Sequence, residues 1–474
     1  YLNGSTAIIG SAITSTVNIS ASSLGMGGSE YGIFISSGRV IVGNGGSLTL
    51  TGTGGGLYSS TGSGNYGIAL TSAIFTAGNG GSTTNTITLS GIGGTGSGGN
   101  HNGINIATAI GINLNGSGNS DTATFLNCHG GLGGSTNIGV NFTAPLTLVR
   151  GTLQFTNTTG GGSGSATDNY GLQLSGVAVT APTILGGDIY GGPGSGTNYG
   201  LYLNGAGAIL GSSTTNLIDM SAGSLGMGGS EHGILISAGS VVVNTSGTML
   251  LTGIGGGLYS SSGSSNYGIS FASSAKLTGG AITLNGTGGT GYIGLGGGHY
   301  GINLQNVAIT SGAGGSTTNT VVITGAGGVG NSGSNYGVYV GGSLNISLNG
   351  TGNSDTLTFL NCVGGTGGPT NIGVDFTSAF ALAHGTLLFT SVIGGGSGTA
   401  NNYGIYINGS NVSVTAPAII GTDILGGPGS GNNYGLYISG STAVLGGTGT
   451  TRMSMSASSL GMGSNEAGIV ICGR

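Results

Sequence analysis

The chain has 474 residues, of which 115 are glycine and 15 are Lys, Arg, Asp or Glu. Five basic residues and a formal net charge of −5 disfavour nucleic acid and anionic membrane surfaces, since no patch could neutralise several phosphates at once. The 36% of hydrophobic residues argues against disorder, the six prolines argue against collagen, and no apolar run is long enough to span a membrane.

The first predicted strand is a recurring Tyr-Gly motif with apolar residues at the first and third positions after the glycine, as in Tyr66–Leu70 and Tyr403–Ile407. Relaxing the aromatic position gives fourteen copies, with glycines from Gly32 to Gly468 at a mean spacing of about 33.5 residues. Alternation with period two sends both apolar side chains to one face of a strand. Each copy therefore predicts one half-buried strand.

Two more short alternating runs follow the first strand within a unit. After Ile33–Ile35 come Val40–Val42 and Leu48–Leu50, with Ser-Gly and Asn-Gly-Gly turn signals between them. Such a unit cannot bury its own apolar face, but stacked units can pair strand on strand around a continuous interior. We predict an all-β fold, a parallel β-solenoid or β-helix with three strands per coil, about 14 coils of ~33 residues and Gly-rich loops. We expect it to be right-handed, as parallel crossovers are.

A longer period lies on top of the coils. The segment Ser-Leu-Gly-Met-Gly-Gly-Ser-Glu at Ser23–Glu30 returns at Ser224–Glu231 and, with two changes, at Ser459–Glu466. The shifts of 201 and 235 residues differ by one coil, and aligning the blocks places the extra coil near 275–306. Inserting a whole coil without disturbing its neighbours is what a one-dimensional stack permits.

This longer period divides one continuous solenoid into blocks. We predict a first block of six coils at 1–201, a second of seven coils at 202–436 and the start of a third at 437–474. Because Tyr1–Gly4 matches Tyr202–Gly205, the sequence opens inside a strand. Unpaired strand edges invite further stacking, so we expect a fragment of a longer repetitive polypeptide or a subunit that stacks end to end.

Two sets of tyrosines stand out in the repeat. Those before the unit glycine would lie one coil apart and are predicted to form a structural ladder, with a ligand platform as the alternative. Those two positions after the glycine point outward and are candidates for exposed contacts with sugar rings. The ladder set is Tyr31, Tyr66, Tyr170, Tyr199, Tyr267, Tyr300, Tyr336, Tyr403 and Tyr434, and the outward set is Tyr202, Tyr339, Tyr406 and Tyr437.

The residues that carry chemistry are few and dispersed. The ten acidic residues are mostly solitary, so paired carboxylates for glycoside hydrolysis are lacking, and the five histidines have no metal-ligand spacing. Asp375 is predicted to point outward, and its equivalent in the shorter block is Asn141. Gly186–Gly192 resembles a calcium-binding nonapeptide but occurs singly, so we favour a plain turn at Asp188. We predict no catalytic residue, no cofactor and no metal site, and hence no enzyme.

The three cysteines are odd in number, which precludes a fully paired set of disulfides. Cys128 and Cys362 occupy equivalent places in Phe-Leu-Asn-Cys, seven coils apart. At ~4.8 Å per coil they are about 34 Å apart, far beyond the ~7 Å that a disulfide allows between Cα atoms. We expect buried free thiols, with cross-linking of neighbouring chains as the alternative for these cysteines and Cys472.

The Gly/Ser/Thr/Asn-rich repeats of short strands resemble the β-strand-repeat passengers of bacterial surface proteins, of the autotransporter and filamentous-adhesin type. Gly279–Ile282 also matches the short repeat of chlamydial polymorphic outer-membrane proteins, which are similar passengers. The resemblance implies a secreted, extracellular or cell-surface protein.

We therefore predict an extracellular structural fibre or stalk whose main partner is itself, stacked end to end or side by side. The low charge favours lateral packing because little like-charge repulsion opposes it. The alternative is an adhesin passenger that binds glycans or host surfaces through exposed Tyr and Asn. A polysaccharide-active β-helix enzyme is the third and least favoured hypothesis.

Overall fold

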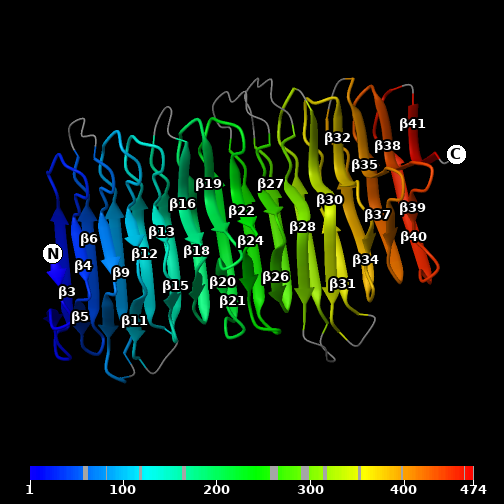
Figure 1. Ribbon diagram of the computed structural model, residues 1–474. Helices are drawn as coiled ribbons and strands as arrows, with labels where there is room; N and C mark the ends of the chain where they lie inside the picture. Colours follow the sequence, from blue (N-terminus) through cyan, green and yellow to red (C-terminus); the bar gives the residue numbers. More distant parts are fainter. Residues whose placement is uncertain are drawn as a thin grey trace. The chain divides into compact units, whose positions relative to one another are not determined.

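A computed structural model describes most of the chain, which divides into two compact units. Unit 1 comprises Tyr1–Gly226 and Gly239–Val243, and unit 2 comprises Met227–Ala238 and Asn244–Arg474. Every regular element of the described residues is a β-strand (Figure 1). No helix that could cross a bilayer occurs in the described part of the chain. The described residues are 1–56, 62–81, 83–116, 120–162, 167–256, 265–289, 298–312, 318–331, 333–350, 354–396, 399–463 and 465–472.

In unit 1 each coil contributes one strand to each of three parallel ladders. The first ladder holds β1 (Leu2–Asn3), β4 (Ile33–Ser36), β7 (Ile68–Thr71), β10 (Ile104–Ile106), β13 (Val140–Phe142), β16 (Asp168–Ser175) and β19 (Thr197–Asn204). The second holds β2 (Ile8–Gly10), β5 (Arg39–Val42), β8 (Ile74–Ala77), β11 (Ile110–Leu114), β14 (Leu146–Thr147), β17 (Ala178–Thr180), β20 (Ile209–Gly211) and β23 (Ser240–Val242). The third holds β3 (Thr16–Ser22), β6 (Ser47–Thr53), β9 (Thr86–Ile92), β12 (Thr122–His129), β15 (Thr152–Thr159), β18 (Thr183–Gly191) and β21 (Leu217–Ser224).

Unit 2 repeats this arrangement, except that the first and second strands of two coils run on as the long strands β28 and β30. The first ladder holds β22 (His232–Ser237), β25 (Ile269–Ala272), β28 (Ile302–Ser311), β30 (Ser334–Leu348), β32 (Thr370–Phe376), β35 (Asn401–Asn408), β38 (Asn432–Ser439) and β41 (Asn465–Cys472). The second holds β26 (Ala275–Gly279), the later parts of β28 and β30, β33 (Phe380–Ala381), β36 (Ser413–Thr415) and β39 (Val444–Leu445). The third holds β24 (Thr248–Ile254), β27 (Ala281–Thr287), β29 (Thr320–Ala326), β31 (Thr356–Leu360), β34 (Thr386–Ile393), β37 (Ala418–Gly426) and β40 (Arg452–Ser459).

The register pairs equivalent positions of successive repeats. Ile33 lies opposite Ile68, which in turn lies opposite Ile104, so the apolar residue after each unit glycine forms one inward column. The predicted parallel β-solenoid with three strands per coil is confirmed. The chain forms about 13 coils rather than the predicted 14. The hand of the coil stays a prediction.

The coil predicted as an insertion near 275–306 contains β26, β27 and the start of β28. It therefore supplies one strand to each of the three ladders and pairs in register with its neighbours. Its assignment as an insertion, like the block boundaries, stays a prediction from the sequence.

Most of the interior is apolar and closely packed. Phe125 stacks on Phe155 with ring centroids 5.2 Å apart and an interplanar angle of 17°, and both rings are fully buried. In the next coil the column continues with Gly186, where an added Cβ would lie 2.5 Å from the terminal methyl of Met220. The absent side chain makes room for the long methionine, as expected in a core packed to crystal-like density.

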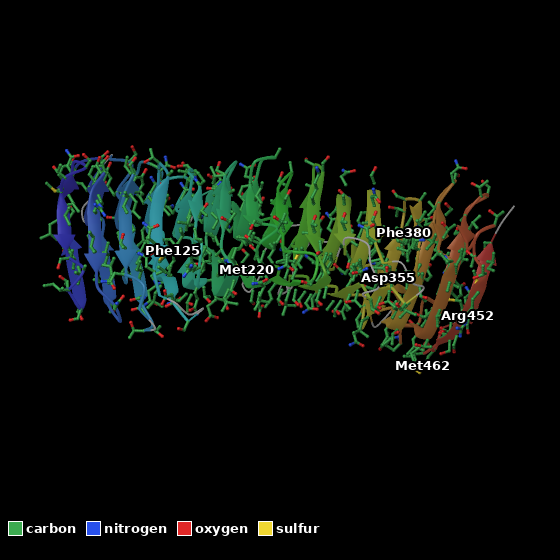
Figure 2. The ribbon with its side chains drawn as sticks, turned by 90° about the horizontal axis from the view of Figure 1, so that it is seen from below. Phe125, Met220, Asp355, Phe380, Arg452 and Met462 are labelled. Atoms are coloured by element: carbon green, nitrogen blue, oxygen red, sulfur yellow. The ribbon has the colours of Figure 1, made fainter. Side chains whose placement is uncertain are left out.

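Unit 2 repeats this core pattern. Phe359 stacks on Phe389 at 5.3 Å, and the column ends on Gly421 and Met455, with 2.8 Å between an added Cβ and the methionine methyl. Figure 2 shows Phe125 of unit 1 and, in unit 2, Phe380 of the second ladder among the strands, whereas Met462 lies at the margin. Met462 is 88% exposed and Phe380 is 1% exposed.

Sharp corners separate the three strands of a coil. After the first strand the chain takes a positive φ at residues such as Ser37 (61°) and Ser72 (53°), and after the second at glycines such as Gly10 (79°). A further corner, inside the third strand, uses Asn127 (51°) and its equivalents. Small and Asn side chains tolerate the left-handed region best, which explains their frequency at these positions.

Candidate functional site

The ladder tyrosines of unit 1 form two stacks on the outer face of the first ladder. Tyr31 and Tyr66 lie with ring centroids 5.6 Å apart, and Tyr170 and Tyr199 lie 5.2 Å apart with an interplanar angle of only 5°. Between the stacks, the position before the unit glycine holds Asn102 and then Ile138, which interrupt the ladder.

Unit 2 holds the longer run of rings. Tyr267 lies 4.8 Å from Tyr300, which lies 4.7 Å from Tyr336, and His232 extends the stack at 4.9 Å from Tyr267. Burial lowers the pKa of His232 to about 3, so this ring is neutral in the stack.

A second stack in unit 2 joins Tyr403 to Tyr434 at 5.7 Å. Ile372 holds the position before the unit glycine in the coil between the two stacks. The nine ladder tyrosines thus all lie in ring stacks, two within unit 1 and two within unit 2.

The outward tyrosines join the same clusters instead of forming a separate surface. Tyr202 contacts both Tyr170 and Tyr199 edge-on at 5.0 and 5.1 Å, and Tyr339 lies 5.2 Å from Tyr300. All four outward rings are half-buried. Within each unit the two sets therefore belong to one surface, which we call the tyrosine face of that unit.

The same arrangement closes the second stack of unit 2. Tyr406 lies 4.9 Å from Tyr403, and Tyr437 lies 5.1 Å from Tyr434 and 5.3 Å from Tyr406. Four rings from two successive coils thus contact one another, which leaves each of the two outward rings with only part of its surface open to solvent.

The unit glycine explains why residues three positions apart share a face. An added Cβ at Gly67 would lie 2.4 Å from the backbone nitrogen of Ile92, on the third strand of the same coil. The backbone there approaches too closely for any side chain, so the chain bends at the glycine and the alternation changes phase. The residue before the glycine then faces out and the residue before that faces in.

That inward residue forms a polar column that the sequence interpretation missed. It is buried in most coils and is an amide in most copies: Asn169 donates from Nδ2 to Oδ1 of Asn198 at 2.7 Å, and Asn402 donates to Asn433 at 2.7 Å. An Asn, His or Glu at this place in every copy was the available signal. The column is Glu30, Asn65, His101, Asn137, Asn169, Asn198, Glu231, Asn266, His299, Asn335, Asn371, Asn402, Asn433 and Glu466.

The three glutamates of this column explain the long-period segment. Ser23 Oγ donates to Glu30 Oε2 at 2.7 Å, and Ser459 Oγ donates to Glu466 in the same way. The backbone N–H of Gly463 also donates to Glu466 Oε1, at 2.7 Å. These hydrogen bonds hold the pKa of Glu466 below its usual range, although desolvation acts in the opposite direction. The repeated spacing of Ser and Glu within the segment is therefore structural.

Asp375 occupies an unexpected environment on the tyrosine face. Its backbone position does face outward, but its side chain is only 2% exposed because Tyr339 precedes it and Tyr406 follows it in the column. Tyr336 hydrogen-bonds to the carboxylate, while Oδ1 has no partner. Burial raises the pKa of Asp375 to about 7, and the hydrogen bond opposes this only in part.

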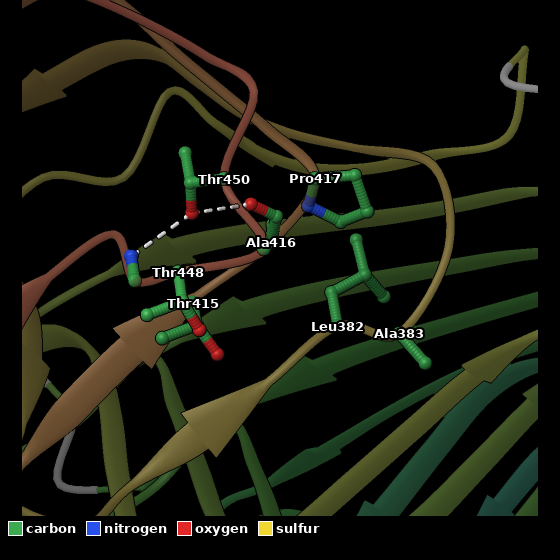
Figure 3. A pocket seen from close by; sticks show the side chains of 9 residues that line it. Leu382, Ala383, Thr415, Ala416, Pro417, Thr448 and Thr450 are labelled. Carbon is green, nitrogen blue, oxygen red and sulfur yellow. Dashed lines mark hydrogen bonds between the residues drawn. The ribbon is translucent and has the colours of Figure 1, made fainter.

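The surface cavities offer little for catalysis. One in unit 2 has a volume of about 260 Å³ and is lined by Leu382, Ala383 and the segments 415–417 and 447–450, none of them ionisable (Figure 3). Thr450 Oγ1 there accepts from the backbone N–H of Gly447 and donates to the carbonyl of Ala416.

Two further cavities each carry one basic side chain. One of about 500 Å³ in unit 1 includes Arg150 together with Asn113 and Asn115, and one of about 240 Å³ in unit 2 includes Lys276. Among the described residues that line these two cavities there is no carboxylate. A lone cation without an acid or base partner does not supply proton transfer.

The structure shows where the three cysteines lie and which conformation the predicted turn at Asp188 adopts. Cys128 and Cys362 are free and buried, and burial raises the pKa of each thiol to about 12, whereas Cys472 is free and exposed.

Asp188 has a φ of 54° at a bulge of β18, and its equivalent Asp423 has a φ of 53° at a bulge of β37. Within the described residues, no three His, Cys, Asp or Glu side chains come close enough to hold a metal ion.

The fold defines the class of protein, a parallel β-solenoid built from repeated coils. Compared with protein-family models, with curated protein sequences and with solved structures, the chain matches none.

Proposed function

We propose that this chain is a segment of an extracellular structural fibre or stalk that assembles by stacking its coils. The observation that carries the proposal is the uniform register, in which Leu172 pairs with Leu201 and Leu436 pairs with Ile469 at equivalent places of different coils. Backbone hydrogen bonds of this kind do not depend on the chain being continuous. A coil of a second copy could therefore add to the stack end to end, as strands add at any open sheet edge.

Side-by-side packing is supported by the outer face of the third ladder. In unit 1 its central column runs through Thr49, Thr88 and Thr124, all half-buried and uncharged. With 15 charged residues in 474, little electrostatic repulsion opposes the approach of two such faces. Because charge contributes so little, assembly should respond weakly to added salt.

Electron microscopy of the protein at high and low concentration tests the fibre proposal. Filaments that form at high concentration and persist in about 1 M salt, where the Debye length is about 3 Å, are the expected result. Short dispersed particles at every concentration would contradict it.

The proposed extracellular or cell-surface location follows from the resemblance to bacterial surface passengers rather than from the fold. Support comes from the Gly/Ser/Thr/Asn composition and the short strand repeats, which are shared with such passengers. Protease treatment of intact source cells, followed by detection of the remaining protein with an antibody, tests this location. We expect the antigen to be accessible on intact cells and the protease to remove it. Antigen that is detected only after the cells are lysed would refute a cell-surface location.

A second candidate is an adhesin that binds glycans, and the tyrosine face favours it. Tyr406 and Tyr437 are half-buried rings stacked 5.3 Å apart, and exposed ring surface can stack on sugar rings. A glycan array tests it with the wild type and Tyr406→Ala/Tyr437→Ala, with Tyr190→Ala on β18 as the matched control. Binding lost only in the double variant supports this candidate, and an array blank for the wild type removes it.

We propose no catalytic activity for the chain. No carboxylate occurs among the described residues that line the three cavities above, which supports this view because glycoside hydrolysis uses two acidic side chains across one site. Turnover of any polysaccharide in a hydrolysis screen, abolished by a point substitution in one of these cavities, would overturn it.

A further inference from the structure

A run of four rings in unit 2 brings oxidisable side chains into direct contact. Tyr300 and Tyr336 lie with centroids 4.7 Å apart and planes at 14°, and they belong to the successive coils of β28 and β30. Tyr267 lies 4.8 Å from Tyr300, and Tyr339 lies 5.7 Å from Tyr336. Two phenol rings held at this separation are already positioned for bond formation between them.

The buried carboxyl of Asp375 lies beside this run of rings, although ring stacking alone requires no carboxyl. The side chain is 2% exposed, its Oδ1 has no partner, and Tyr336 hydrogen-bonds to the carboxylate. The titratable groups that face it are Tyr300 beside β28, Tyr336 and Tyr339 of β30, and Tyr406 of β35. No basic side chain is among these groups, so its only charge-compensating contact there is a phenol proton.

A phenol that loses one electron also loses its proton, and a hydrogen-bonded base makes that loss easier. Of the two rings in closest contact, Tyr336 has such a base. We propose that Tyr336 and Tyr300 form an oxidative cross-linking site, at which a peroxide-dependent one-electron oxidant couples the two rings into dityrosine with Asp375 accepting the proton of Tyr336.

The step balances as a two-electron oxidation. Each tyrosine gives up one electron and its phenolic proton, that of Tyr336 to Asp375 and that of the half-buried Tyr300 to water. Hydrogen peroxide takes the two electrons and two protons and becomes two water molecules. The ring carbons ortho to the two hydroxyls then form one C–C bond, and each ring regains aromaticity as its ortho hydrogen moves to its oxygen.

The product ties two neighbouring coils of unit 2 together by a covalent bond. Because the geometry is internal to the unit, the reaction does not require the chain to form fibres. The base is competent only when ionised, and burial raises the pKa of Asp375 to about 7, so the yield of coupling should increase as the pH rises from 5 to 8.

The test oxidises the whole chain with a haem peroxidase and limiting hydrogen peroxide at pH 5 and pH 8. Elastase digestion and mass spectrometry then identify peptide pairs that have lost two hydrogen atoms, and dityrosine fluorescence gives the total yield. The Tyr31 and Tyr66 pair, 5.6 Å apart, serves as an internal control because burial and the neighbouring Tyr31, and not a carboxylate, raise the pKa of Tyr66. We expect cross-links between Tyr300 and Tyr336 to dominate at pH 8.

Two variants separate the proton acceptor from stacking alone. Asp375→Asn keeps the size of the side chain, and asparagine already occupies the equivalent position 141. It should lower coupling at Tyr336 by roughly 10²-fold, the low end of what a positioned base contributes to proton transfer. Tyr336→Phe should abolish these cross-links and leave those of Tyr31 with Tyr66 unchanged.

Either of two results would overturn the proposal. One is a yield at Tyr336 no higher than that of the control pair at pH 8. The other is unchanged coupling at Tyr336 in the Asp375→Asn variant. If that variant does not fold, the pH dependence of the wild type decides: a flat yield at Tyr336 between pH 5 and 8 refutes the role of Asp375.

Discussion

The two units carry the same backbone position with different chemistry, at Asn141 in unit 1 and Asp375 in unit 2. Both residues lie two positions after the glycine of their coil, and both leave a buried Oδ1 without a partner. Asn141 donates from Nδ2 to Asn105 Oδ1 of the preceding coil at 3.0 Å, so an amide row continues. Asp375 instead lies between Tyr339 and Tyr406.

The coil therefore determines where this backbone position lies, and the side chains of the neighbouring coils determine the chemical environment of the residue there. An uncharged amide can donate one hydrogen bond and leave its oxygen unpaired at small cost, since an unpaired neutral acceptor costs about 1–3 kcal/mol. A buried carboxylate is far more costly to ionise without a cationic partner, which is why its pKa rises. Apart from this position, the two units are expected to behave alike.

The largest effects are expected in the phenylalanine core. Phe155→Ala in unit 1 and Phe389→Ala in unit 2 each remove a fully or almost fully buried ring from an equivalent stack and should each lower the stability to unfolding by about 3–5 kcal/mol. Denaturant unfolding measures both. Thr390→Ala, on the outer face of β34, is the control and should change stability by less than about 0.5 kcal/mol. Clearly unequal losses would show that the two cores are not equivalent.

The next effect distinguishes the units by pH. The folded-state pKa of Asp375 is raised from 3.8 to about 7, so its contribution is most favourable at acidic pH and is lost as the pH rises from about 4 to 7. The loss is on the order of 4 kcal/mol, since a tenfold change in proton affinity corresponds to about 1.36 kcal/mol. Unfolding midpoints measured from pH 4 to 8 should fall in the wild type and fall less in Asp375→Asn.

The converse substitution completes that pH test. Asn141→Asp should introduce a smaller downward slope into unit 1, because the new carboxyl would be only partly buried beside Asn105, without the two tyrosines that cover Asp375. Wild type and Asp375→Asn with identical slopes would show that Asp375 is not buried as described.

A smaller effect is expected in the inward amide column. Asn402 donates to Asn433 and accepts from Asn371 at 3.2 Å, so Asn402→Ala leaves buried polar groups unpaired and should cost about 1–3 kcal/mol. Asn169→Ala should cost the same in unit 1, where Asn169 lies between two other amides. Asn408→Ala, at the exposed end of β35, is the control. Losses no greater than that of the control would show that the column contributes nothing to stability.

Thiol labelling gives the most local comparison. Cys472 should react rapidly with an aromatic disulfide reagent at pH 8, while Cys128 and Cys362 should stay protected because both are buried and their pKa values are about 12. Unfolding should expose all three. Since Cys128 and Cys362 are equivalent, their exposure at different denaturant concentrations would show which unit opens first, and fast labelling of either in the native protein would contradict its burial.

The sequence predicted the ladders well because strand formation here depends on local alternation. The residues at the first and third positions after each unit glycine, such as Ile33 and Ile35, face inward because side chains alternate along a strand. The register between coils follows from the equal spacing of these positions along the chain. The ring stack of Tyr300 and Tyr336 follows from that register.

What the sequence did not predict depends on the corner at the unit glycine and on side chains from other coils. Strict alternation would send Asn169 outward, but the bend at Gly171 places it inside. Asp375 was predicted to point outward, and its backbone position does so, but the burial of its side chain arises from Tyr339 and Tyr406, which belong to the preceding and following coils.

X-ray diffraction from aligned filaments of the protein tests the central claim most directly. If coils stack along the fibre axis as they stack within each unit, the pattern must show a meridional reflection at about 4.8 Å, the spacing of hydrogen-bonded strands. Filaments that lack this meridional reflection, or a protein that forms no filaments at any concentration, would contradict the account.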